Sequence, residues 1–151
     1  MAKHDQKGRR KGGPPFVMMR YDVIDSAAWK SLTPAARSIY LQIARRFNGE
    51  NNGYLAASVR DLALECNVAP NTVTASINQL ISVALIDRTQ EGSFTTKVRL
   101  AAEYRLACIK CNRTGREASN DFRRWRPAGP ATLRAEKDSD CVQPSRAGSA
   151  A

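Results

Sequence analysis

Residues 58–86 read SVRDLALECNVAPNTVTASINQLISVALI, in which two apolar repeats of helical period are separated by a three-residue break. In the first repeat, apolar residues from Val59 to Cys66 recur at i, i+3, i+4 and i+7, and Ser58 can cap the predicted helix. Cys66 is therefore expected to be a core thiol. Pro70 suits the first position of a second helix, whose apolar face comprises Val73, Ile77, Leu80, Ile81 and Ala84. Two helices joined by a tight turn are typical of a helix-turn-helix.

The segments around this pair complete an α+β, mainly α, pattern. Thr33-Pro34 predicts the start of an earlier helix with an apolar stripe up to Phe47, and residues 48–53 predict a turn before a brief strand at 54–57. Residues 16–24 are expected to be extended or a strand, ahead of a helical turn capped by Asp25 or Ser26.

The residues after the second helix predict a β-hairpin. We expect a strand at 85–90, a turn at 91–93 and further β-structure at 94–106, which would form a wing beside the helix pair. The expected fold is thus a winged helix-turn-helix with disordered basic termini.

Charge and composition divide the chain into four parts. Residues 1–15 are predicted to be a disordered basic arm, 16–109 the winged helix-turn-helix domain, 110–127 a C-terminal extension and 128–151 a disordered tail. The net charge of +10 is uneven, with +5 on residues 1–20, +1 on 21–101 and +4 on 102–151. Basic ends favour contact with nucleic acid through counterion release, although solvated tails can have the same composition.

One long run of residues has a family resemblance. Residues 31–53, then 55–63 and Asn71-Thr72-Val73, closely resemble bacterial winged helix-turn-helix proteins of the plasmid and phage replication-initiator type found in alphaproteobacteria. The similarity extends over about residues 16–127 and implies a DNA-binding fold. Ala84 stands where many relatives have glycine, which would cost on the order of 1 kcal/mol if its backbone is left-handed. Ala69-Pro70 replaces a serine-initiated turn and removes a capping hydroxyl.

The outward face of the second helix holds the candidates for base contacts. A rotation of 100° per residue turns these side chains outward or to the flanks when the apolar face is buried. They are Asn71, Thr72, Thr74, Ala75, Asn78 and Gln79. Asparagine and glutamine pair with adenine, and no Lys or Arg lies between Pro70 and Leu85, so we expect readout that favours A·T pairs. The alternative is a solvated polar face.

Candidate phosphate contacts come from three regions of the chain. They are Ser58 and Arg60 at the start of the first helix of the pair, Arg88, Lys97 and Arg99 in the wing, and Lys7, Arg9, Arg10 and Lys11 in the arm. Each of these residues, taken alone, could equally be a solvated surface group.

The cysteines and the single histidine do not predict a metal, a cofactor or a catalytic site. Cys108-x-x-Cys111 has the spacing of half a zinc knuckle, but the other candidate ligands are only Cys66, Cys141 and His4. A redox role lacks the usual strand-to-helix setting. No glycine-rich phosphate loop or carboxylate cluster is present, so we expect a protein that is not an enzyme, without bound metal, cofactor or disulfide.

Three functions compete. The favoured one is sequence-specific binding of double-stranded DNA, to regulate transcription or replication of a plasmid, phage or other mobile element. The second is a protein-interaction adaptor in a replication or conjugation complex, and the third is non-specific coating of nucleic acid by the tails. A homodimer on a palindrome is compatible with the first, although no heptad run is present. Because no apolar run approaches the roughly 18 residues of a membrane span and no signal peptide precedes the domain, a cytoplasmic protein is expected.

Overall fold

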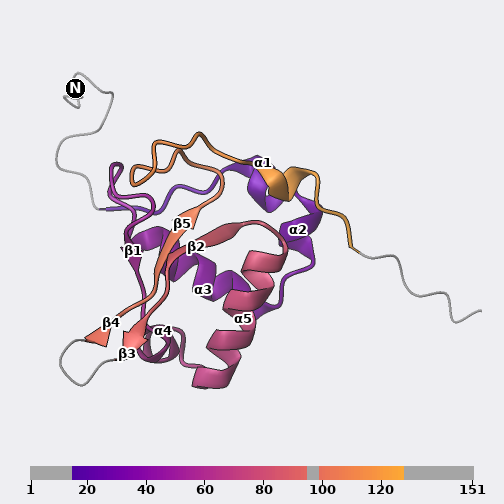
Figure 1. The fold of residues 1–151 in the computed structure, drawn as a ribbon. Helices are drawn as coiled ribbons and strands as arrows, with labels where there is room; N and C mark the ends of the chain where they lie inside the picture. Colours follow the sequence, from indigo (N-terminus) through magenta and orange to yellow (C-terminus); the bar gives the residue numbers. More distant parts are fainter. Residues whose placement is uncertain (1–14, 95–98, 128–151) are drawn as a thin grey trace, which may run out of the picture.

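The computed structural model describes residues 15–94 and 99–127, which form a mainly helical α+β structure (Figure 1). The helices are α1 (Tyr21–Ile24), α2 (Ala27–Lys30), α3 (Pro34–Arg45), α4 (Val59–Cys66), α5 (Pro70–Ser82) and the short 3-10 helix η1 (Asp121–Arg123). The strands are β1 (Leu55–Ala56), β2 (Ile86–Gln90), β3 (Ser93–Phe94), β4 (Arg99–Leu100) and β5 (Glu103–Leu106).

Three helices begin at the capping residues that the sequence indicated. The hydroxyl oxygens of Ser26, Thr33 and Ser58 each accept the backbone N–H three residues further on, at 3.1–3.2 Å. Such a cap satisfies an amide that has no partner inside the helix. The stripe of α3 is also confirmed, since its inward side chains are buried from Ala36 to Ala44 and Phe47 packs against the core. Cys66 is only partly buried at the edge of that core.

Helices α4 and α5 end in the same way, with one residue in the left-handed conformation. Asn67 follows α4 at φ 53°, and Ala84 follows α5 at φ 57°. In both cases the next N–H reaches the carbonyl five residues back, at 3.0 Å after Asn67 and 3.1 Å after Ala84. This closure is the Schellman motif, in which glycine is usual at the left-handed position and asparagine is sometimes found. The expected strain at Ala84 is therefore present.

A three-stranded antiparallel sheet lies against the helices in the order β1-β5-β2. Leu55 of β1 is opposite Tyr104 of β5, and Ile86 of β2 is opposite Leu106. These four side chains are buried in one cluster with the inner faces of α3, α4 and α5. The short strand between α3 and α4 thus joins a sheet whose other strands come after α5.

The β-hairpin is longer than the sequence indicated. Ser93 of β3 is opposite Leu100 of β4, so the chain reverses beyond Phe94. The turn expected at 91–93 is therefore wrong. Residues 91–92 instead interrupt the strand beside a register shift between Arg88 and Gln90. Gly92 suits this break because a Cβ there would lie 3.1 Å from the Leu100 carbonyl oxygen, so the glycine permits close backbone approach rather than chain reversal.

The expectation of a strand within residues 16–24 is also corrected. Residues 15–20 have no regular structure, and α1 then makes one helical turn. A strand would place Val17, Tyr21 and Val23 on a single face. Only Val23 of these is buried and Tyr21 is 84% exposed, so the segment packs on the core through Val23 and the partly buried Met19 rather than through one face of a strand.

The C-terminal extension is an integral part of the packed structure rather than an appendage after residue 109. Phe122 is fully buried in the main cluster, and Cys111 is also buried. Asn52 is fully buried and its side-chain amide donates to the carbonyls of Leu106, Ile109 and Lys110 at 3.0–3.1 Å. The Asn52 carbonyl oxygen accepts the Leu106 N–H at 2.7 Å. One asparagine therefore joins the turn after α3 to the chain after β5.

An ionic cluster connects the two ends of the described chain. Arg20 donates through Nε and Nη2 to the Asp22 carboxylate and through Nη1 to the Cys108 carbonyl at 2.7 Å. Arg123 of η1 donates to the same carboxylate. The hydrogen bond from Arg20 is the main cause that lowers the pKa of Asp22; burial acts against it, and the hydrogen bond from Arg123 adds a smaller lowering effect.

Candidate nucleic-acid interface

The outward face of α5 consists of uncharged polar and small side chains. The opposite face packs on α3 and α4 through Val73, Ser76, Ile77 and Leu80. Five of the six predicted base-facing residues are exposed on the free face: Asn71, Thr72, Thr74, Ala75 and Asn78. The Thr74 hydroxyl donates to the Pro70 carbonyl at 3.2 Å, so it is engaged within the helix. The exposed donors and acceptors of this face are thus chiefly the two asparagine amides and the Thr72 hydroxyl.

Gln79 does not join this group. Its amide oxygen accepts from the backbone and hydroxyl of Thr33 at 3.4 and 3.2 Å, and its amide nitrogen donates to the Ser31 carbonyl at 3.3 Å. The prediction of a base-facing Gln79 is corrected, because both ends of its amide are used to connect α5 to the corner between α2 and α3. Its position on the flank of the apolar face brought it within reach of that corner.

The start of α5 lacks a side-chain cap, as the Ala69-Pro70 sequence indicated. Arg60 of α4 is exposed and borders an open depression with Leu64, Asn67 and Pro70. The structure therefore brings the predicted phosphate contact Arg60 next to the beginning of α5. The Ser58 hydroxyl, in contrast, accepts the Asp61 N–H and serves as a helix cap.

The remaining predicted phosphate contacts are only partly described. Arg88 on β2 is exposed, with its guanidinium 6.0 Å from the Tyr104 ring centroid and 3.4 Å from a Glu91 carboxylate oxygen. Arg99 begins β4. Lys97 and the arm residues Lys7, Arg9, Arg10 and Lys11 lie outside the described residues.

Lys30 is a candidate that the sequence reasoning missed. It is exposed at the end of α2, directly before Ser31, whose carbonyl oxygen accepts from Gln79 of α5. Arg37 donates to the Lys30 carbonyl at 3.1 Å and lies 5.9 Å from the Trp29 ring centroid. The sequence signal was weak, because Lys30 belongs to a one-turn helix far from α5 in the chain. Only the folded corner brings the residue that follows Lys30 into contact with α5.

The cysteines do not form a metal site in the part of the chain that is described. Cys66, Cys108 and Cys111 are free thiols, and these residues contain no group of three potential metal ligands. Cys108 Sγ lies 3.7 Å from the Tyr40 hydroxyl, and burial raises the pKa of its thiol. Burial also acts to raise the pKa of Cys111, but hydrogen bonds from Thr114 and the Arg113 amide lower it overall. Each thiol is thus held by its own neighbours.

Comparison with known proteins provides no relative from which a function could be inferred. No family model, no curated protein and no solved structure matches this chain. Among residues 15–94 and 99–127, no helix is long and apolar enough to cross a membrane.

Proposed function

We propose that this protein binds double-stranded DNA in a sequence-specific manner and that α5 is its recognition helix. The observation that carries the proposal is the exposed polar face of α5, on a helix whose opposite face is fixed against α3 and α4. Helix α4 and the turn at Asn67 precede it, which is the order of a helix-turn-helix. A rigid helix with short polar side chains is suited to enter the major groove.

The proposed fold is a winged helix-turn-helix. In this interpretation α3, α4 and α5 are the three helices, β1 is the strand between the first two, and β2 to β5 form the wing. The order β1-β5-β2 and the β3–β4 continuation of the hairpin support it. Figure 1 shows the hairpin extending from the sheet beside α4, toward the same end of the molecule as the start of α5. A groove contact and a backbone contact could then be made together.

The chemistry of the face favours A·T-containing sites. Asn71 and Asn78 can each make paired hydrogen bonds with adenine, and Ala75 can contact a thymine methyl. The first backbone N–H groups of α5 have no capping side chain and can donate to phosphate, while Arg60 beside them supplies a charge. Lys30 can act similarly from the α2–α3 corner. The basic ends of the chain add salt-dependent affinity.

The biological role that we propose is regulation of transcription or replication of a plasmid, phage or other mobile element. It rests on the resemblance of residues 31–53, 55–63 and 71–73 to replication-initiator-type proteins. Binding as a homodimer would present two α5 helices to half-sites about one helical turn apart.

The test is selection of bound fragments from a DNA library by the full chain at about 150 mM salt, where much of the non-specific attraction is screened. We expect an A·T-rich motif whose affinity falls about tenfold or more in Asn71→Ala and Asn78→Ala, since one good base contact contributes about 1–3 kcal/mol. Asn48→Ala is the matched control, because Figure 1 places the turn after α3 at the opposite end of the molecule from the start of α5. Equal affinities for all three variants would refute the role of α5.

A second candidate function is a protein-interaction adaptor, and one observation favours it. Leu64 on α4 is 75% exposed and borders the same depression as Arg60 and the start of α5. Combined with an uncharged α5 face, this apolar side chain would suit a protein partner. Absence of any enriched DNA motif, together with loss of a captured partner in Leu64→Ala, would favour the adaptor over the regulator.

A further inference from the structure

A polar depression of about 410 Å³ lies between the sheet and the C-terminal extension. It is formed by β2, β5 and residues 111–121, and it does not involve α5. Its charged lining residues are Arg88, Arg105, Arg113, Arg116, Asp87 and Asp121. The four arginines exceed the two aspartates, so the lining has a formal charge of +2.

Arg105 is the buried member of this group. Only 6% of the residue is exposed. Its Nε donates to Asp87 Oδ2 at 2.6 Å, and its Nη2 is paired with the same oxygen. Its Nη1 is buried and has no hydrogen-bond partner among the described residues. A guanidinium is always charged and has five N–H donors, and buried donors of this kind are normally hydrogen-bonded. The buried Nη1 of Arg105 therefore lacks an acceptor that a bound ligand could supply.

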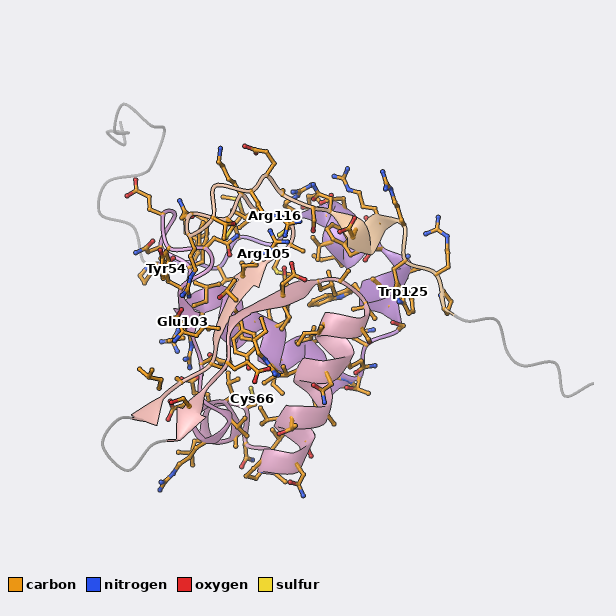
Figure 2. The ribbon with its side chains drawn as sticks, in the orientation of Figure 1. Tyr54, Cys66, Glu103, Arg105, Arg116 and Trp125 are labelled. Atoms are coloured by element: carbon orange, nitrogen blue, oxygen red, sulfur yellow. The ribbon has the colours of Figure 1, made fainter. Side chains whose placement is uncertain are left out.

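Arg116 supplies an uncommitted charge to the same depression. Within residues 15–94 and 99–127, Arg88 is paired with Glu91 and Arg113 with Glu103, whereas the Arg116 side chain has no such carboxylate. The backbone of Arg116 is nevertheless held in place, since its carbonyl oxygen accepts the Cys111 N–H at 2.8 Å. Figure 2 shows Arg105 and Arg116 together at the end of β5 that is remote from the β3–β4 hairpin.

We propose that this depression binds a small phosphate-type oxyanion, held between Arg105 Nη1 and the Arg116 guanidinium. Two guanidinium groups offer several N–H donors that match the oxygens of a phosphate, and such charged hydrogen bonds are stronger than neutral ones. Because Arg105 Nη1 is buried, side chains that line the depression must move for an anion to reach it. The Asp121 carboxylate lines the same depression and opposes the anion, so it limits the affinity.

The test is the melting temperature of the full chain as sodium phosphate replaces sodium chloride at constant ionic strength, up to about 10 mM, well below the range of general salt exclusion. A ligand that binds only the folded state raises this temperature in a saturable manner. We expect Arg116→Gln to weaken the apparent affinity about tenfold, because it removes a charged donor. Arg124→Gln is the matched control: it removes the same charge from an exposed arginine of the neighbouring segment that does not line the depression.

Asp121→Asn gives the complementary result. Removing its negative charge is expected to strengthen phosphate binding several-fold, which a merely stabilising role for the depression would not produce. Identical phosphate responses of the wild type, Arg116→Gln and Arg124→Gln would overturn the proposal. It would also be overturned if free phosphate had no effect while Arg116→Gln weakened binding of a duplex, since the partner would then be the DNA backbone. If no DNA motif were enriched in the selection experiment, the phosphate measurement would still stand, so the two proposals are tested separately.

Discussion

Replacing Ala84 by glycine should stabilise the protein, because Ala84 holds a left-handed backbone at the end of α5. Its φ of 57° costs an L-residue about 1–2 kcal/mol. Glycine removes that cost, but its greater conformational freedom in the unfolded chain destabilises the folded state by about 0.4–1 kcal/mol and so offsets part of the gain. Loss of the partly buried methyl group removes a little more. The net gain expected for Ala84→Gly is about 0.5–1 kcal/mol, or a rise of about 2–4 °C in melting temperature.

Asn67 provides the matched control for this prediction. It occupies the equivalent position after α4, at φ 53°, with the same closing hydrogen bond. Because asparagine tolerates this conformation better than alanine, Asn67→Gly should change the free energy of unfolding little, and Asn67→Ala should lower it by about 1 kcal/mol. Urea unfolding of all three variants measures these differences. If Ala84→Gly brings no gain while Asn67→Ala brings no loss, the strain reasoning is refuted.

Two other sites give predictions that the same unfolding measurements can check. Asn52→Ala should lower the free energy of unfolding by about 3 kcal/mol, because it leaves the buried Leu106 N–H and neighbouring carbonyls without their partner. A loss below about 1 kcal/mol would show that these hydrogen bonds do not hold the C-terminal extension in place. The hydrogen bond from Arg20 holds the pKa of Asp22 in the folded state below its value in the unfolded chain. The ionised carboxylate therefore stabilises the fold above about pH 4, and this stabilisation is lost as the pH falls through the pKa of the folded state. Asp22→Asn should therefore be less stable than the wild type at pH 7 but close to it at about pH 2, and a pH-independent difference would contradict the ionic account.

The local signals in the sequence were reliable wherever the physics is local. Thr33-Pro34 and Ser58 start helices because a hydroxyl three residues from an amide can cap it regardless of the rest of the fold. The inward stripe of α3 and the exposed asparagines of α5 likewise follow from a period of 3.6 residues. These features sufficed to predict an α+β, mainly helical chain and most of the candidate face of α5.

Errors arose where a residue has two plausible local roles. Gly92 was compatible with a hairpin turn or with a strand break, and only the pairing of β3 with β4 selects the break. Gln79 lies on the flank of α5, and its orientation is decided by Ser31 and Thr33, which are nearly fifty residues away in the chain. Periodicity places a side chain around its own helix but does not reveal which other segment comes within hydrogen-bonding distance.

The amino-acid sequence by itself determined helices α2 to α5, the hydroxyl caps of the first three of them, the polar face of α5 and the concentration of positive charge at the two ends, because each depends on neighbours within a turn or on composition. The tertiary structure alone decided that Cys111 and Phe122 of residues 110–127 are buried, that Asn52 bridges two distant loops, and that Arg105 is buried beside Arg116. The Asn52 bridge depends on a contact between segments about fifty residues apart. The proximity of Arg105 to Arg116 depends on how the chain reverses between them. Such contacts are specified by the burial of the whole chain rather than by any short pattern within it.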